Sequence, residues 1–278
     1  MSFRRYLIEK GKENPKLKRI KDNMLNTGNP YGKPTTNKLS WQKDFKFNSS
    51  SSTMFFGGCT MPLKDRETLG KYIELLGPEN LTVMEGEPCC GSTVHRVGYE
   101  DAHVHQATQI IDYVIEHGIK EIFTACPGCY STLKEDMEKA GVDVKVRHAV
   151  EGIKDRIQNG EIVIQKQDIT VTYHDPCHLG RLGGVLEEPR FVIQSTANLV
   201  EMKDHGMDSL CCGAGGGVRA AFPDLSHDVA RRRLEQAENT GAELIVSACP
   251  FCENQPREAG EKKVSDVVDL VYAAWKKE

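Results

Sequence analysis

Short apolar runs alternate with helical patterns along most of this chain. From Thr53 onward, β-prone runs at 122–124 and 244–246 each follow a segment with an apolar residue at every third or fourth position. The two helical faces read from this spacing are Val104, Ala107, Ile111 and Val114, and Ala230, Leu234 and Ala237. Strands that alternate with helices are typical of βαβ units with a mainly parallel sheet. The pattern therefore predicts an α/β fold.

The same pattern occurs twice. HGIKEIFTACPGC (117–129) aligns without gaps with TGAELIVSACPFC (240–252). Upstream, each half has a β-prone run that leads to a lone cysteine, and then a Cys-Cys-Gly triplet. We therefore expect two tandem Rossmann-like βαβ modules, at 53–160 and 161–278, related by a pseudo-twofold axis.

Two residue types mark the ends of the expected helices. Gly118 and Gly241 are placed to end a helix before each strand. Pro127 and Pro250 follow the first cysteine of each Cys-Pro-x-Cys motif, where they suit the first position of a helix.

The first fifty residues differ from the rest. They carry 12 Lys and Arg against 4 Asp and Glu, and glycines and prolines interrupt them between Gly28 and Pro34. A segment of this composition has too little apolar surface to fold alone. We expect 1–52 to be an extended basic linker that lies along a partner, and removal of 1–45 to leave the rest intact and to weaken partner binding.

Composition excludes several classes of protein. The 278 residues are 39% hydrophobic with a net charge of −4, and no run approaches the ~18 apolar residues of a membrane helix. No apolar run follows Arg4 and Arg5, so no secretory signal is expected. The sequence has no zinc-finger or helix-turn-helix pattern, so nucleic acid is not an expected partner. We expect a cytoplasmic protein, where thiols stay reduced.

The ten cysteines fall into two sets of five. In an open α/β sheet, the loops after the strands meet at one edge, which brings each set together. An odd number per half does not suit disulfides, and structural zinc takes four ligands, which would leave one thiol over. Iron–sulfur clusters fit best, and zinc in one half stays an alternative. The first set is Cys59, Cys89, Cys90, Cys126 and Cys129, and the second set is Cys177, Cys211, Cys212, Cys249 and Cys252.

These motifs resemble the CCG-domain family, which includes the B subunit of heterodisulfide reductase and the catalytic half of its D subunit. The family pattern is a cysteine, a Cys-Cys-Gly triplet and a Cys-x-x-Cys pair, here separated by 29 and 35 residues and by 33 and 36 residues. HDPCHLGR (174–181) and CCGAGGGVR (211–219) also resemble the family's second repeat. The stretch 28–41 resembles the segment after the ferredoxin-like part of fused members.

The resemblance implies a cofactor, a reaction and partners. Each repeat would bind a noncubane 4Fe-4S cluster through all five cysteines, and a disulfide would be reduced or formed between the two clusters. The implied partners are a ferredoxin-like subunit of the C-subunit type and a flavin-containing or membrane-linked electron donor. Two alternatives stay open: an electron-transfer subunit of a lactate-, glycolate- or quinone-linked oxidoreductase, and an assembly subunit with zinc in one half.

Basic residues beside the cysteines are further candidates. They could donate hydrogen bonds to sulfur or bind an anionic substrate group, or else cap a loop or pair with a carboxylate. These candidates are His178, Arg181 and Arg219, with His95 and Arg96 in similar places of the first repeat. The histidines expected on helix surfaces are His103, His105 and His227.

Overall fold

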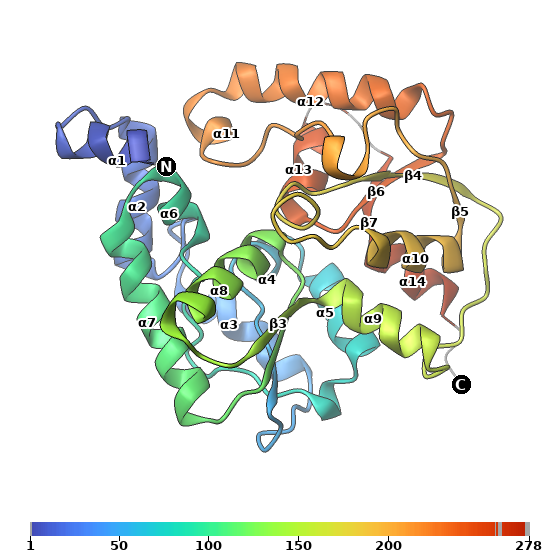
Figure 1. The fold of residues 1–278 in the computed structure, drawn as a ribbon, viewed down its shortest axis with the longest axis horizontal. Coiled ribbons are helices and arrows are strands. Elements are labelled where there is room, and N and C mark those ends of the chain that lie inside the picture. The colour runs from blue at the N-terminus through green and yellow to red at the C-terminus, as the bar shows by residue number, and fades with distance from the viewer. Residues whose placement is uncertain (1, 259, 261–262, 276–278) are drawn as a thin grey trace.

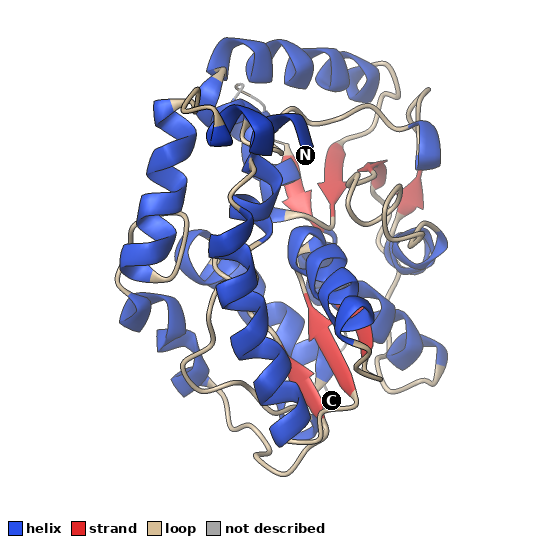
Figure 2. Cartoon of the chain, turned by 60° about the vertical axis from the view of Figure 1, so that its left-hand side comes forward, coloured by secondary structure: helices blue, strands red, loops and turns tan. Residues whose placement is uncertain are grey.

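Two parallel sheets form the centre of the computed structural model, which describes residues 2–258, 260 and 263–275 (Figure 1). Helices cover both sheets, as Figure 2 shows in a second view. The first sheet has the order β1 (Thr53–Phe55), β2 (Glu121–Thr124), β3 (Lys145–His148). The second has the order β5 (Asn198–Leu199), β4 (Thr170–His174), β6 (Leu244–Ser247), β7 (Val264–Asp266). The predicted α/β class is confirmed.

The two sheets pair their strands in the same way. In each, the strand before the lone cysteine lies beside the strand before the Cys-x-x-Cys pair, with Met54 opposite Ile122 and Thr172 opposite Ile245. Thr82 adds a parallel bridge to Met54, which corresponds to the pairing of β5 with β4. The β-prone runs predicted from the sequence are therefore strands, and they lie at the centres of their sheets.

Helices connect the strands. In the first half they are α4 (Thr60–Lys64), α5 (Arg66–Leu76), η2 (Pro78–Asn80), α6 (Ser92–Val97), α7 (Glu100–Glu116), α8 (Pro127–Ala140) and α9 (Ala149–Gln158). In the second half they are α10 (Glu187–Thr196), η3 (Gly206–Asp208), α11 (Val218–Ala221), α12 (Pro223–Glu238), α13 (Pro250–Glu258) and α14 (Val267–Ala274).

The predicted helix boundaries are confirmed. Pro127 and Pro250 are the first residues of α8 and α13. Gly118 and Gly241 follow the ends of α7 and α12 with φ angles of 61° and 70°, a conformation that glycine adopts without strain.

The prediction of which face of α7 is buried is partly wrong. Val104 is 51% exposed and Ile111 is half-buried, whereas Ile110 is fully buried. Two polar residues, His103 and Gln106, occupy positions that face the core. The prediction counted only apolar residues, so it missed the buried polar side chains on this face. The predicted face is therefore displaced by one residue.

The N-terminal segment is helical, so the extended conformation expected for 1–52 is wrong. It forms α1 (Ser2–Glu9), α2 (Pro15–Thr27), α3 (Thr35–Leu39) and the short helix η1 (Ser40–Asp44). The side chain of Asn14 caps α2 by accepting from the backbone N–H of Lys16 at 2.9 Å, and Gly28 ends the helix. Leu17, Ile20 and Met24 share one face of α2 and pack against the core. Tertiary contacts thus stabilise helices that the composition did not indicate.

Figure 1 shows these N-terminal helices beside the first repeat, not apart from it. Helix α2 contacts α6, α7 and α11, so it reaches elements of both halves. The halves also meet directly, where the Tyr72 hydroxyl donates to Asp266 Oδ1 at 2.6 Å and Lys71 pairs with Asp269 at 2.9 Å.

Trp41 is the largest side chain that the N-terminal segment buries. It is 1% exposed and packs edge-on against Phe47 and Phe55, with ring centroids 5.9 Å and 6.0 Å away. A Cβ atom on Gly57 would lie 2.6 Å from the Trp41 ring, so the indole rests on the backbone that leads to Cys59.

Replacing Trp41 by Ala is expected to lower the free energy of unfolding by about 3–5 kcal/mol, because a large cavity would open under β1. Denaturant unfolding followed by circular dichroism measures the change. Phe3→Ala is the matched control, since Phe3 is 72% exposed and its loss should change stability by less than about 0.5 kcal/mol. Equal effects of the two substitutions would contradict the prediction.

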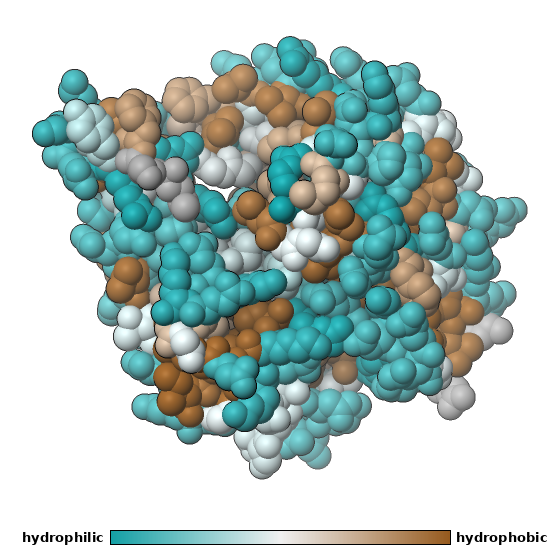
Figure 3. Space-filling model, in the orientation of Figure 1, coloured by the Kyte–Doolittle hydropathy of each residue, from teal (hydrophilic) through white to brown (hydrophobic). Residues whose placement is uncertain are grey.

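The face of the molecule in Figure 3 is mostly hydrophilic, with separate apolar patches. Within the described ranges, no helix combines the length and apolar character needed to cross a bilayer.

Candidate metal centres

The first cysteine set lies at the carboxyl end of the first sheet. Cys59 precedes α4, the Cys-Cys-Gly triplet precedes α6, and the Cys-x-x-Cys pair begins α8. All five side chains are 1–8% exposed, and the sulfurs of Cys59 and Cys89 are 3.5 Å apart. Hydrogen bonds between thiols continue this contact through Cys90 and Cys129 to Cys126.

The second set repeats the arrangement in the same order. Cys177 contacts Cys211, which contacts Cys212, and the chain of contacts ends at Cys252 and Cys249. The sulfurs of Cys212 and Cys252 are 3.2 Å apart. All ten cysteines are free thiols, and the second set is the more open, because Cys211 is exposed and Cys177 is half-buried. The structure therefore brings together both predicted groups of five.

The first cysteine of each Cys-Cys-Gly triplet ionises readily. Hydrogen bonds from Cys59 and Cys90 hold the pKa of Cys89 well below its usual value. Those from Cys177 and Cys212 lower the pKa of Cys211 to about 2. The thiolate is the form that binds metals. Each set therefore offers a ready metal ligand at the same position of its motif.

The glycine of each triplet is needed for space as well as for conformation. Gly91 and Gly213 have φ angles of 75° and 84°. An added Cβ would lie 2.6 Å from the His103 ring in the first repeat and 2.4 Å from the Ser226 carbonyl oxygen in the second. The Gly213 backbone N–H also donates to Cys211 Sγ at 3.3 Å.

A buried ion pair lies under the first set. The Lys38 ammonium, 1% exposed, donates to the Glu87 backbone oxygen and lies 3.5 Å from the Glu87 carboxylate. That carboxylate accepts from the backbone N–H groups of Gly57 and Gly58 at 2.9 Å each. The hydrogen bond between Cys59 and Cys89 holds the pKa of Cys59 well above and that of Cys89 well below its usual value, and the charge of Lys38 lowers both by a smaller amount. No sequence pattern indicated this pair, because its members lie 49 residues apart.

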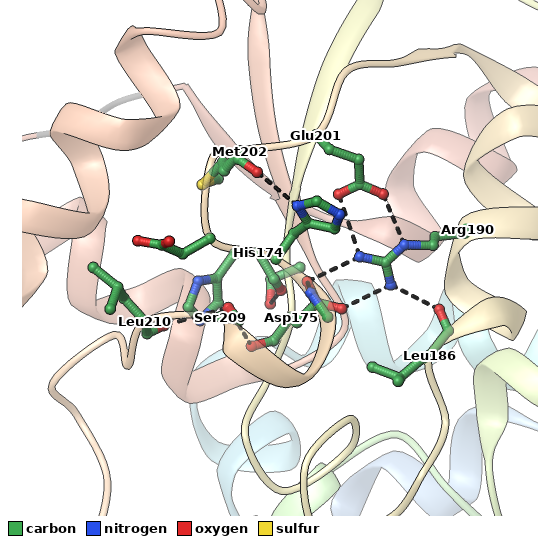
Figure 4. Close-up of polar contacts among 12 residues, drawn as sticks. His174, Asp175, Leu186, Arg190, Glu201, Met202, Ser209 and Leu210 are labelled. Atoms are coloured by element: carbon green, nitrogen blue, oxygen red, sulfur yellow. Dashed lines mark hydrogen bonds and ion pairs between the residues drawn. The ribbon is translucent and has the colours of Figure 1, made fainter.

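A second network fixes the loops that carry Cys177 and Cys211. The Asp175 carboxylate accepts from Arg190 at 2.8 Å and 3.0 Å and from the Gly206 backbone N–H at 2.8 Å. Arg190 also pairs with Glu201 at 2.7 Å, as Figure 4 shows. These contacts join β4 to α10 and to the segment that precedes Cys211, and so position both cysteines.

A cavity of about 630 Å³ opens onto the second set. Among the described residues, its lining includes all five cysteines of the second set and none of the first. Helices α2 and α6, the residues between the first-set cysteines Cys126 and Cys129, and the glycine run after Gly213 form most of the remaining walls. Its basic lining residues are Lys16, Arg19, Arg96 and Arg219.

The other predicted site residues have different surroundings. His178 lines the cavity with Nδ1 3.5 Å from Cys177 Sγ, and burial, followed by the charge of Arg96, lowers its pKa to about 4. Arg181 donates to the backbone oxygens of Met207 and Ser209 at 3.1 Å and 2.6 Å, which anchors a loop. Arg219 lines the cavity and pairs with Glu258.

The corresponding residues of the first repeat, His95 and Arg96, differ in their access to the cavity. His95 is 2% exposed and bonds Glu100 at 2.9 Å, whereas Arg96 lines the cavity and donates to Ser131 Oγ at 3.3 Å.

Among the histidines expected at the surface, His103 is the exception. It is 3% exposed, its Nε2 is 3.0 Å from Asp136 Oδ1, and its ring packs against His95. The surface position expected for it is wrong, because Asp136 on α8 supplies a buried polar partner. His105 is exposed and His227 is half-buried.

A family model described as a cysteine-rich domain, CCG, matches residues 53–134 and again residues 171–256. The chain belongs to this CCG family. Both matches contain a complete cysteine set, so the two repeats are the two family domains.

Three curated relatives share most of this chain. The D subunit of the dihydromethanophenazine:CoB–CoM heterodisulfide reductase of Methanosarcina acetivorans is 34% identical over 88% of this chain and 64% of its own length. The B subunit of the fumarate reductase (CoM/CoB) of Methanothermobacter marburgensis is 31% identical over 82% of this chain and 47% of its own length. The EtfAB:quinone oxidoreductase of Syntrophomonas wolfei is 26% identical over 91% of this chain and 40% of its own length. The chain thus spans less than two thirds of each.

The solved structures are more distant. An aspartate racemase from Picrophilus torridus is 12% identical, with a TM-score of 0.38. The superposition covers 81% of this chain and 95% of the racemase chain.

The donor sets fit an iron–sulfur cofactor. Each offers clustered thiols, at least one of them a ready thiolate, with backbone glycines close by, and thiolate is the usual ligand of such clusters. Together with the family and its relatives, this makes the chain an iron–sulfur protein.

Proposed function

We propose that this chain is the catalytic iron–sulfur subunit of a heterodisulfide reductase-like complex, which reduces or forms a disulfide with two noncubane 4Fe-4S clusters. The observation that carries the proposal is the cavity onto which all five thiols of the second set open. The first set would hold its cluster behind the wall formed by Pro127 and Gly128. When bound, the clusters would supply one electron each.

The cavity lining supports an anionic organic disulfide as substrate. Four cations surround an interior that also has apolar members, among them Ile20 and Phe251. Arginine binds sulfonate, carboxylate or phosphate groups through paired N–H donors, and Arg96 and Arg219 lie on opposite repeats. A substrate with acidic ends and an apolar body would be oriented with its sulfurs at the second set.

His178 is the residue proposed to act beside the reacting sulfur. Its neutral ring lies 3.5 Å from Cys177 Sγ in the cavity wall, so it can donate or accept one hydrogen bond there. Arg181, which anchors the loop through two carbonyl oxygens, would position Cys211.

The domain arrangement and the partners belong to the same proposal. The shared strand order supports two Rossmann-like units, 53–160 and 161–278, related by a pseudo-twofold axis. Electrons would arrive from a ferredoxin-like subunit and a flavin-containing or membrane-linked donor, in the cytoplasm. The alternative is electron transfer alone. The likeness to the quinone oxidoreductase and the complete burial of the first set favour this alternative, because a relay needs no access for substrate.

Metal content tests the proposal. Two clusters of four irons predict about eight irons and eight sulfides per chain, with no stoichiometric zinc. Elemental analysis of anaerobically purified protein measures this. About four irons with one zinc would contradict the two-cluster proposal and favour the assembly or electron-transfer alternative.

A further inference from the structure

His174 is a buried histidine that the proposed function does not yet use. It is the last residue of β4 and is 4% exposed. One of its ring nitrogens lies within 4.8 Å of the sulfurs of Cys212 and Cys252. Its backbone oxygen accepts from Ser247 Oγ at 3.0 Å, which ties the end of β4 to β6. The ring is therefore fixed beside the second set.

Arg233 determines which nitrogen of His174 carries a proton. The Arg233 Nε–H donates to His174 Nδ1 at 2.9 Å. A guanidinium has donors only and stays protonated, so Nδ1 must present its lone pair, and the proton of the neutral ring is on Nε2. Arg233 cannot turn away easily, because it also donates to the Asp204 backbone oxygen at 2.6 Å and to Ser209 Oγ at 3.1 Å.

The same contact argues against His174 as a metal ligand. A histidine that binds a metal through Nε2 carries its proton on Nδ1 and donates it to an acceptor. Here that proton would point at the N–H of Arg233, so two donors would face each other. His174 is arranged to donate from Nε2 and not to coordinate.

We propose that His174 donates a hydrogen bond from Nε2 to a sulfur of the cluster bound by the second set, and that Arg233 holds it in this tautomer. The inference rests on the proposed function in one respect, that the second set binds a cluster. A hydrogen bond to cluster sulfur stabilises the reduced, more negative state, and so raises the reduction potential.

The first repeat has no such donor at the same place. His174 lies three residues before Cys177, and the residue three before Cys59 is Phe56, which is fully buried and has no polar atom. The nearby cation of the first repeat, Lys38, is paired with the Glu87 carboxylate. The His174 hydrogen bond would therefore raise the potential of a cluster in the second set relative to the same cluster without it, which would favour electron transfer toward the cavity.

A redox titration followed by EPR tests this. His174→Phe copies the first repeat. In this variant the equilibrium constant for reduction of one cluster should fall about tenfold, which lowers its reduction potential by about 59 mV for one electron. The potential of the other cluster should stay unchanged. His174→Gln, which retains an N–H donor, should restore most of the shift. Thr172→Val, on the same strand and fully buried, is the matched control and should leave both potentials unchanged. Unchanged potentials in His174→Phe would overturn the proposal.

A measurement with His174 in place covers the case in which His174→Phe loses its cluster. Protein labelled with ¹⁵N-histidine should show, by pulsed EPR, one nitrogen and one exchangeable proton coupled to a single cluster. The sample carries His178→Asn, because His178 also lies near a cysteine of the second set. If both clusters form but this coupling is absent, the inference is wrong and the proposed function is unaffected. A cluster in the first set only would contradict the proposed function and the inference together.

Discussion

Replacing Cys212 by Ala is expected to abolish disulfide reduction while the chain stays folded and the first set keeps its cluster. Cys212 joins Cys211 to Cys252 in the second set, so its loss divides the donor group. Even an outer partner of a metal ligand changes affinity or activity by about 10- to 100-fold, and loss of a ligand should exceed that. Turnover with an artificial one-electron donor measures the effect.

Cys90→Ala makes the corresponding change in the first set and decides between catalysis and relay. If both clusters share a two-electron cleavage, it should also abolish turnover, although Cys90 does not line the cavity. Val200→Ala, at an exposed position of the second repeat, is the control for general damage and should keep full activity. Near-normal turnover in either cysteine variant would contradict the two-cluster mechanism.

Deletion of residues 1–45 is expected to unfold the first repeat or to remove its cluster. The deletion takes away Met24 and Trp41, each 1% exposed, and leaves the buried Glu87 without Lys38. Loss of a buried tryptophan costs about 3–5 kcal/mol, and breaking a buried ion pair about 3–5 kcal/mol. Together these approach the whole stability of a typical domain, about 5–15 kcal/mol. The sequence alone predicted the opposite result.

Iron content and thermal unfolding of the truncated chain measure this. Deletion of 2–12 is the matched control, because it removes α1 but keeps Lys38 and Trp41. That shorter deletion loses the contacts of Arg4 with the backbone oxygens of Arg96 and Gly216 and the pairing of Arg5 with Glu100, all partly exposed. It should therefore retain both clusters. A 46–278 chain with a full complement of iron would show that the N-terminal helices are dispensable.

Local sequence was enough to predict the strands and the cysteine sets. The β-prone runs before Cys126 and Cys249, the helix-ending glycines and the prolines of the Cys-Pro-x-Cys motifs each act within a few residues. Parallel strands bring their carboxyl ends to one edge, so the spacing of the cysteines already implied two groups.

Local sequence failed where a polar or charged side chain has a distant partner. The basic N-terminal segment looked unable to fold, yet Lys38 is buried against Glu87, 49 residues away. His103 looked like a surface residue, yet Asp136 pairs with it at 3.0 Å. In both cases burial is stable only because the partner compensates for lost hydration, and a pattern of apolar residues carries no information on that partner.

The sequence by itself thus determined the α/β class, the repeat, and which ten thiols form the two sets, because all of these depend on short-range propensity and on regular spacing. Only the tertiary structure decided how the two sets differ. It leaves the first set buried over the Lys38–Glu87 pair and opens the second to a cavity. It also places Arg233 against His174, 59 residues apart. Such differences come from side chains that lie far apart in the sequence and meet across elements, so local sequence patterns do not reveal them.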